Sequence, residues 1–243
     1  QCLPGTVTMP VMPDPLQQLF SNLDKWRHLP NYQLERRLDI FFTPYLVDLL
    51  TAHVGTPLLP VIVPEMPLKR ADSSKSRKVD YVLFAADGSA VYFVELKTDR
   101  GSRRDVQDQY LADAVVRGFP QILRDLLQIL SDTNSHHKYF HLLTLLERAN
   151  QLKIAEHVAP ALYPVRRRGF CFSDGCVEVV AAGAPIRVVY IQPAKTDGCD
   201  CIDFTEVAHF VGRHADPVSR LLATHLARWQ PAAGTMPPER RDV

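Results

Sequence analysis

At 243 residues, with 46% hydrophobic and 23% charged residues, the chain has the composition of an ordinary globular protein that can bury a sizeable core. Its formal net charge of +1 excludes the strongly basic class of proteins that coat nucleic acid by bulk electrostatics, so any phosphate contact must come from local clusters. No apolar run reaches the length of a membrane span and no basic-then-apolar leader opens the sequence, so we expect a soluble chain without a membrane partner.

The first part of the chain predicts an arm followed by a short helix. Residues 1–13 are rich in proline and lack periodicity, which is typical of an arm on the surface. Asp14 followed by Pro15 suits the N-cap and first position of a helix that runs to about Arg27. We therefore assign residues 1–30 to the arm and short helix, and residues 31–243 to a single α/β domain.

The main domain is expected to open with a helix and a short strand. Asn31 is a suitable cap for a helix with apolar residues at helical spacing, and Pro44 should kink this helix before it ends near Gly55. The apolar run over residues 58–63, set between prolines, suits an early or edge strand. The basic stretch over residues 69–78 then predicts a polar loop.

A β-hairpin gives the strongest local signal in the chain. Residues 79–85 and 90–96 are rich in β-branched and aromatic side chains. Asp87 and Gly88 between them favour a tight turn with two loop residues.

The register of this hairpin brings charged residues together. If Asp87 and Gly88 are the loop residues, equal steps away from the turn place Asp80 directly opposite Glu95. Because side chains alternate along a strand, Lys97 projects from the same face as Glu95. The hairpin therefore predicts two carboxylates and an amine at one end of two neighbouring strands.

The rest of the chain predicts helices, then strands, then helices. Ser102 and Asp105 form a capping box for a helix that ends at Gly118. Helical segments are expected over residues 120–130, 135–158, from about 203, and 217–229, and strands over 169–172, 176–181 and 186–193.

The cysteines favour a reducing compartment. There are five, an odd number without a repeating framework, so a cytoplasmic location is expected. Cys171, Cys176, Cys199 and Cys201 could hold zinc if the two pairs meet in space. Their spacing is not that of a standard finger or ribbon, and we favour buried or exposed thiols over a zinc site.

The facing carboxylates predict a bound cation. Two carboxylates about 5 Å apart repel each other, and a sheet would not normally pair them without positive charge between them. A divalent ion and the Lys97 ammonium would supply that charge, and oxygen ligands suit Mg²⁺ or Mn²⁺ better than zinc. This combination is what metal-dependent phosphodiester hydrolysis requires.

Asp80, followed after fourteen residues by Glu95-Leu96-Lys97, resembles the D…(D/E)-x-K signature of the PD-(D/E)xK nuclease superfamily. That superfamily includes many restriction endonucleases and the RecB-type and lambda-exonuclease-type nucleases. The order of predicted elements is similar to its αβββαβ core, with a mixed central sheet, over about residues 31–118 plus 186–193. The resemblance implies a restriction-endonuclease-like α/β fold in which residues of about 119–160 form a helical insertion.

The resemblance also implies roles for residues. Asp80, Glu95 and the backbone carbonyl of Leu96 would bind Mg²⁺ or Mn²⁺, Lys97 would be catalytic, and nucleic acid, with DNA favoured over RNA, would be the substrate. Families of this type often place an acid on the first core helix. Glu35 is the candidate, with an ordinary exposed helical glutamate as the equal alternative.

The sequence departs from the family pattern at two places. Val79 stands where proline commonly precedes the first acid, and Gln107 and Tyr110 are three residues apart where RecB-like members have four. Both side chains could still lie on one side of a helix. The candidate nucleic-acid contacts are Gln107, Gln109, Tyr110, Lys78, Arg100, Arg103 and Arg104.

Two other functions compete with a nuclease that acts on chain ends or internally. One is a nuclease-like fold that binds nucleic acid or protein without cleavage. The other is an unrelated α/β protein with a partner surface on the leucine-rich insertion. Intact Asp80, Glu95 and Lys97 favour the enzyme, and a homodimer or a protein partner stays open.

Overall fold

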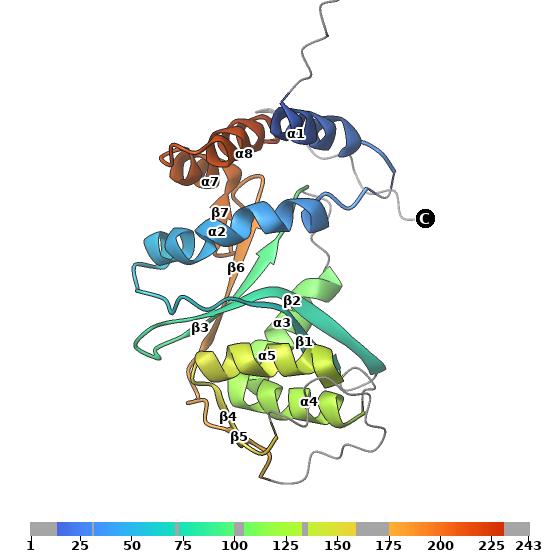
Figure 1. Ribbon diagram of the computed structural model, residues 1–243, viewed down its shortest axis with the longest axis vertical. Coiled ribbons are helices and arrows are strands. Elements are labelled where there is room, and N and C mark those ends of the chain that lie inside the picture. The colour runs from blue at the N-terminus through green and yellow to red at the C-terminus, as the bar shows by residue number, and fades with distance from the viewer. Residues whose placement is uncertain are drawn as a thin grey trace, which may run out of the picture.

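The computed structural model describes residues 14–30, 32–70, 73–99, 105–132, 136–158 and 175–230. In these ranges a five-stranded mixed sheet is combined with seven helices and a separate two-stranded sheet, which confirms the expected mixed α/β class (Figure 1). The helices are α1 (Pro15–Trp26), α2 (Glu35–Val54), α3 (Asp105–Arg117), α4 (Phe119–Asp132), α5 (His136–Arg148), α7 (Phe204–Val211) and α8 (Pro217–Arg228). The strands are β1 (Val63–Arg70), β2 (Ser73–Phe84), β3 (Val91–Leu96), β4 (Leu152–Ile154), β5 (Val177–Val179), β6 (Ile186–Gln192) and β7 (Cys201–Asp203).

The main sheet has the strand order β1-β2-β3-β6-β7. The pairs β1–β2 and β2–β3 are antiparallel, whereas β3–β6 and β6–β7 are parallel. A parallel neighbour requires a crossover, and the chain makes it between β3 and β6 through α3, α4, α5 and the small β4–β5 sheet. None of the helices in the described ranges has both the length and the apolar character of a membrane span.

The hairpin of β2 and β3 has the expected register but a longer loop. Ala85 and Ala90 close the hairpin, with the amide of Ala85 donating to the carbonyl of Ala90 at 3.0 Å, so the loop has four residues and not two. The predicted two-residue loop and the observed four-residue loop have the same centre, between Asp87 and Gly88. Tyr81 therefore pairs with Val94, as the predicted register requires. Continuing this register by one pair places Asp80 opposite Glu95.

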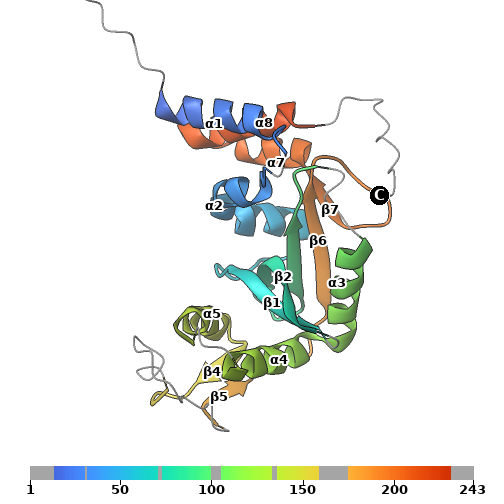
Figure 2. The ribbon, with the colours of Figure 1, turned by 90° about the vertical axis from the view of Figure 1, so that its right-hand side faces the viewer.

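The sheet lies between two apolar layers because its side chains alternate between faces. On one face Val82 and Phe93 belong to a core that includes residues of α3, α4 and α5. On the other face Leu83 and Val94 belong to a core that includes residues of α1, α2, α7 and α8. Figure 2 shows α2 and α3 on opposite sides of the strands. Asp80 lies on the same face as Val82, and Glu95 on the same face as Phe93. Both carboxylates are therefore on the α3 side of the sheet.

The basic stretch over residues 69–78, expected to be a loop, is largely strand. Pro67 pairs with Lys78 and Leu68 with Arg77, so β1 and β2 form a second long hairpin. Buried Met66, Leu68 and Val79 anchor it. A loop was expected because the stretch is basic. Cross-strand pairing and alternate burial instead make it a strand. Strand β1 accordingly begins at Val63, and within residues 58–62 only Leu58 forms a bridge, to Ala85.

Two helix predictions were wrong in detail. The helix expected over 135–158 ends at Arg148, because Asn150 adopts a left-handed φ of 55° and the chain then enters β4. Helix α2 has Leu34, not Asn31, at its N-cap and runs uninterrupted through Pro44. Pro44 has no N–H to donate to the carbonyl of Ile40, four residues earlier. The hydroxyl of Thr43 donates to that carbonyl instead, at 3.0 Å.

Several other expectations agree with the described elements. Asp14 caps α1 with Pro15 at its start, Gly55 ends α2 in the left-handed conformation, and Asp203 with Glu206 forms the capping box of α7. The arm over 1–13, the cap at Ser102 and the strand over 169–172 fall outside the described residues.

Gly88 is the position at which the hairpin loop depends on backbone freedom. Its φ is 73°, and a Cβ there would meet nothing within 4 Å, so an added side chain would cost backbone strain alone. We expect Gly88→Ala to lower the free energy of unfolding by about 1 kcal/mol, measured by urea denaturation. Gly183→Ala is the matched control, because Gly183 has equal space without a positive φ. Equal effects of the two variants would contradict this account of the turn.

Candidate active site

A pocket of about 690 Å³ opens where β3 ends. Its walls come from the start of α2, from β1 and β2, from the end of β3 with the residues after it, and from the first turns of α3. Glu35, Asp80, Glu95 and Lys97, which sequence reasoning singled out, all line it. Segments far apart in the chain therefore meet around the residues of the predicted site.

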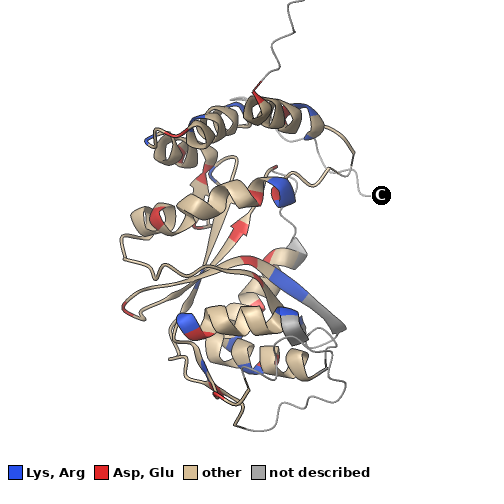
Figure 3. Ribbon diagram, in the orientation of Figure 1, with Lys and Arg blue, Asp and Glu red and all other residues tan. Residues whose placement is uncertain are grey.

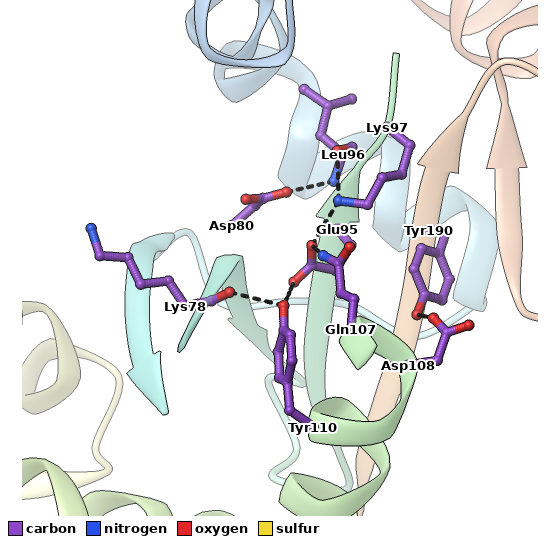
Figure 4. Close-up of polar contacts among 9 residues, drawn as sticks. All are labelled: Lys78, Asp80, Glu95, Leu96, Lys97, Gln107, Asp108, Tyr110 and Tyr190. Carbon is purple, nitrogen blue, oxygen red and sulfur yellow. Dashed lines mark hydrogen bonds and ion pairs between the residues drawn. The ribbon is translucent and has the colours of Figure 1, made fainter. Parts of the chain in front are cut away.

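Glu95 is the most enclosed charged residue of the pocket, with 1% of its surface exposed. Three donors meet its carboxylate (Figure 4). The Lys97 ammonium lies 3.1 Å from Oε2, the Gln107 side-chain amide donates to the same oxygen, and the Tyr110 hydroxyl lies 3.4 Å from Oε1. The structure thus brings Gln107 and Tyr110 of α3 together at one carboxylate, despite their three-residue spacing.

Asp80 and Lys97 are both tied to the backbone at Leu96. The amide of Leu96 donates to Oδ2 of Asp80 at 2.8 Å, and the Lys97 ammonium donates to the carbonyl of Leu96 at 3.2 Å. Lys97 is 5% exposed, so its charge is directed inward to these oxygens. The ammonium therefore bridges the Glu95 carboxylate and the Leu96 carbonyl.

Burial makes this carboxylate pair costly to ionise. Desolvation first, and the charge of Asp80 second, raise the pKa of Glu95 to about 8, although Lys97 acts in the opposite direction. Desolvation also raises the pKa of Asp80, against the effect of the Leu96 amide and of Lys97. Additional positive charge between the two carboxylates would relieve both effects.

Glu35 lies at the first position of α2 and lines the same pocket. Its Oε1 atom is buried and has no hydrogen-bond partner among the described residues. A buried carboxylate oxygen without a donor is costly, and a cation or ordered water is the usual compensation. This placement favours a site role over that of an exposed helical glutamate.

The pocket contains more acidic than basic side chains. The acidic residues are Glu35, Asp39, Glu65, Asp80, Glu95 and Asp99, and the basic residues are Arg36, Arg77, Lys78 and Lys97. The formal excess is two negative charges. Figure 3 shows a basic segment of β2 beside acidic positions of β2 and β3. The basic side chains are thus close to the acids but do not outnumber them.

The oxygen atoms of the pocket could hold a hard divalent cation. Among the residues that the structure describes, no three His, Cys, Asp or Glu side chains lie close enough together to hold a metal ion. A cation would therefore use two carboxylates, Asp80 and Glu95, with the carbonyl of Leu96, a donor set that suits Mg²⁺ or Mn²⁺. The raised pKa values of both acids fit such an ion.

The remaining predicted contacts are dispersed. Gln109 is exposed and donates to Asp113, outside the pocket. The Lys78 ammonium pairs with Glu65 at 2.6 Å on the pocket wall. Arg100, Arg103 and Arg104 lie outside the described residues, as does Cys171. Cys176 and Cys201 are buried and Cys199 is partly buried.

Glu65 is a pocket residue that sequence reasoning missed. It lies in β1 between the pairs Pro64–Tyr81 and Met66–Val79, a register that places it across from Asp80. Its φ of 54° is unusual for a residue with a side chain. The sequence could have indicated that Glu65 lies beside Asp80 only if residues 63–70 had been recognised as a strand paired with β2.

Comparison with known proteins gives no relative for this arrangement. No protein-family model matches the sequence, and neither the curated proteins nor the solved structures contain a match.

The buried Glu95 predicts a specific pH dependence of stability without added metal. Its pKa is about 8 in the folded chain, above its ordinary 4.5, so the folded state holds the proton more tightly. This contribution is complete below pH 4.5 and is lost as the pH rises to about 8. In a chelating buffer, urea denaturation from about pH 5 to about pH 9 should show the wild type losing stability relative to Glu95→Gln. Parallel curves for the two proteins would refute this, and exposed Glu156→Gln, as the control, should parallel the wild type.

Proposed function

We propose that the protein is a nuclease of the PD-(D/E)xK type, which hydrolyses phosphodiester bonds of nucleic acid, with DNA favoured, and depends on Mg²⁺ or Mn²⁺. The observation that carries the proposal is that Asp80, buried Glu95 and Lys97 share one pocket. Buried Glu95 and Lys97 beside partly buried Asp80, with the pKa values of both acids raised, form the kind of cluster that is common at catalytic sites.

The order of elements supports a restriction-endonuclease-like core. Helix α2, strands β1, β2 and β3, helix α3 and strand β6 follow the αβββαβ order, with the first acid on β2 and the Glu-x-Lys triplet at the end of β3. Under this assignment α4, α5 and the β4–β5 sheet are the insertion, and α1, α7 and α8 extend the face opposite α3.

The chain's own residues have distinct roles in the proposed reaction. Asp80, Glu95 and the Leu96 carbonyl would hold the cation. Glu35 is a further acid of the same pocket, but it does not lie close enough to both carboxylates to complete a three-acid metal group. A divalent cation bound there would act as a Lewis acid on the phosphoryl group and make water a better nucleophile at neutral pH. Gln107 and Tyr110 fix the orientation of the Glu95 carboxylate.

Lys97 is the residue proposed to act on the reacting phosphate. Its buried ammonium can orient the attacking water or offset negative charge that develops on the phosphoryl oxygens. The two contacts to Glu95 and Leu96 hold the ammonium at one place, so little rearrangement is needed as charge develops.

One observation favours the second candidate, a nuclease-like fold that binds without cleaving. The Lys97 ammonium already contacts two of the oxygens proposed as cation ligands, those of Glu95 and Leu96, so the protein itself partly neutralises them. Cleavage assays separate the two functions.

The proposed nuclease function predicts cleavage of nucleic acid. Linear, circular and single-stranded DNA and RNA are incubated with Mg²⁺ or Mn²⁺, and products are resolved by electrophoresis. We expect Asp80→Asn and Lys97→Ala to lower the rate by about a hundredfold or more, because each removes a group that stabilises the reacting phosphate. Asp113→Asn, an exposed acid of α3 outside the pocket, is the matched control and should keep wild-type activity. Folded wild-type protein that cleaves none of these substrates would support the binding function instead.

The charge of the pocket predicts how a cation changes binding without cleavage. At about pH 9, where Glu95 is ionised, the formal excess of two negative charges in the pocket should make a polyanion bind weakly until a cation offsets them. We expect Ca²⁺, which also takes oxygen ligands, to tighten binding of a labelled oligonucleotide at least about tenfold over chelating buffer at equal ionic strength, by fluorescence anisotropy.

The double variant Asp80→Asn/Glu95→Gln is the test of that electrostatic cause. At about pH 9, above the raised pKa of Glu95, it removes two negative charges, so in chelating buffer it should bind at least about tenfold more tightly than the wild type. Wild-type affinity that is the same with Ca²⁺ and with chelator would show that the pocket charge does not control binding.

A further inference from the structure

Tyr32 lines the pocket, and Trp26 and Arg37 contact Tyr32; we call these three residues the aromatic rim. Trp26 ends α1 with 45% of its surface exposed, and its ring centroid lies 6.2 Å from that of Tyr32, at 66°. The guanidinium carbon of Arg37 lies 4.5 Å from the centroid of Tyr32. An exposed indole, a phenol ring and a planar cation therefore stand in series.

Two observations place this rim at the pocket and not elsewhere on the surface. Tyr32 and Arg36 themselves line the pocket. Arg27, which follows Trp26, lies within electrostatic range of Asp99, another lining residue. The end of α1 and the segment before α2 thus form the wall that continues outward from the candidate active site.

The exposure of Trp26 is not explained by packing. The second tryptophan, Trp229, is 4% exposed and its indole donates to Asp24. Trp26 instead leaves nearly half of its surface to solvent, and Leu29 beside it is 54% exposed. Large aromatic faces next to arginine are what successive nucleic-acid bases stack on, because every base has a π-face.

The shape of the site limits what can use this wall. A pocket of about 690 Å³ is in the size range of small-molecule sites, and suits one or a few nucleotides. In a double helix the bases are paired and stacked on each other, so they cannot stack on a protein side chain unless they are unpaired.

We propose that the substrate presents unpaired nucleotides beside the scissile phosphate, and that their bases stack on Trp26 and Tyr32 while Arg36 and Arg37 contact the backbone. This inference rests on the proposed function and narrows its substrate class to single-stranded nucleic acid or to duplexes with unpaired ends. The stacked bases would place the phosphate that follows them in the pocket with Asp80, Glu95 and Lys97.

Trp26 itself provides the measurement, because it is the exposed one of the two tryptophans. Protein in Ca²⁺ buffer is titrated with a mixed-sequence single-stranded oligonucleotide and, at equal nucleotide concentration, with a relaxed, covalently closed circular duplex that has no unpaired end or loop. We expect the single strand to quench tryptophan fluorescence, and the closed duplex to leave it nearly unchanged. In Trp26→Phe the quenching should disappear, since the remaining signal comes from buried Trp229.

Affinities of variants test the stacking contribution. By anisotropy, Trp26→Ala and Tyr32→Ala should each weaken binding of the single strand at least about fivefold, whereas Trp26→Phe, which keeps an aromatic face, should stay close to wild type. Val180→Ala, at an exposed apolar residue outside the pocket, is the control and should have no effect. Circular dichroism and thermal unfolding verify that each variant is folded.

The outcomes separate this inference from the proposed function. Equal binding of single strand and closed duplex, or unchanged affinity in folded Trp26→Ala and Tyr32→Ala, would overturn the inference. If the protein still cleaves nucleic acid in that case, the proposed nuclease function stands. Quenching by single strands without any cleavage would keep the inference and overturn the nuclease.

Discussion

The arrangement of the whole site follows from one constraint, a carboxylate buried directly across a strand pair from a second carboxylate. Burying Glu95 opposite Asp80 is unfavourable, and the raised pKa values of both acids express that cost. The surrounding groups act as compensation. Lys97, Gln107 and Tyr110 donate to Glu95, while the Leu96 amide donates to Asp80. The fold must hold all these donors in place for the pair to persist.

Helix α3 is held by the strand that carries Glu95 and by its neighbour. In the parallel pairing of β3 with β6, Glu95 lies beside Tyr190. The consecutive residues Gln107 and Asp108 of α3 contact this pair, because Gln107 donates to Glu95 and Tyr190 donates to Asp108 at 2.6 Å. Figure 4 shows both contacts side by side. The Tyr190 bond thus fixes the helix at the residue next to the one that orients the Glu95 carboxylate, which makes Tyr190 a positioning residue.

The sequence allowed the centre of the site to be predicted but not its walls. The pairing of Asp80 with Glu95 depended only on the centre of the turn, so it was correct although the loop has four residues. Glu65 was missed because a basic segment that forms a strand was read as a loop. The rim at Tyr32 arises from tertiary packing of the α1–α2 segment against the sheet end, and no local pattern in one chain indicates such a meeting.

The charge balance of the pocket connects the chain's low net charge with the proposed substrate. A protein with a formal charge of +1 and an acidic pocket cannot attract nucleic acid by general electrostatics. Under the proposed function, affinity would come from a cation at the acids and from contacts that do not depend on charge. The proposed stacking on Trp26 and Tyr32 is a contact of this second kind, and stacking is less sensitive to salt than phosphate binding. The acid pair and the aromatic rim would then be complementary, because the first would make binding conditional on the cation and the second would supply the affinity that electrostatics alone would not.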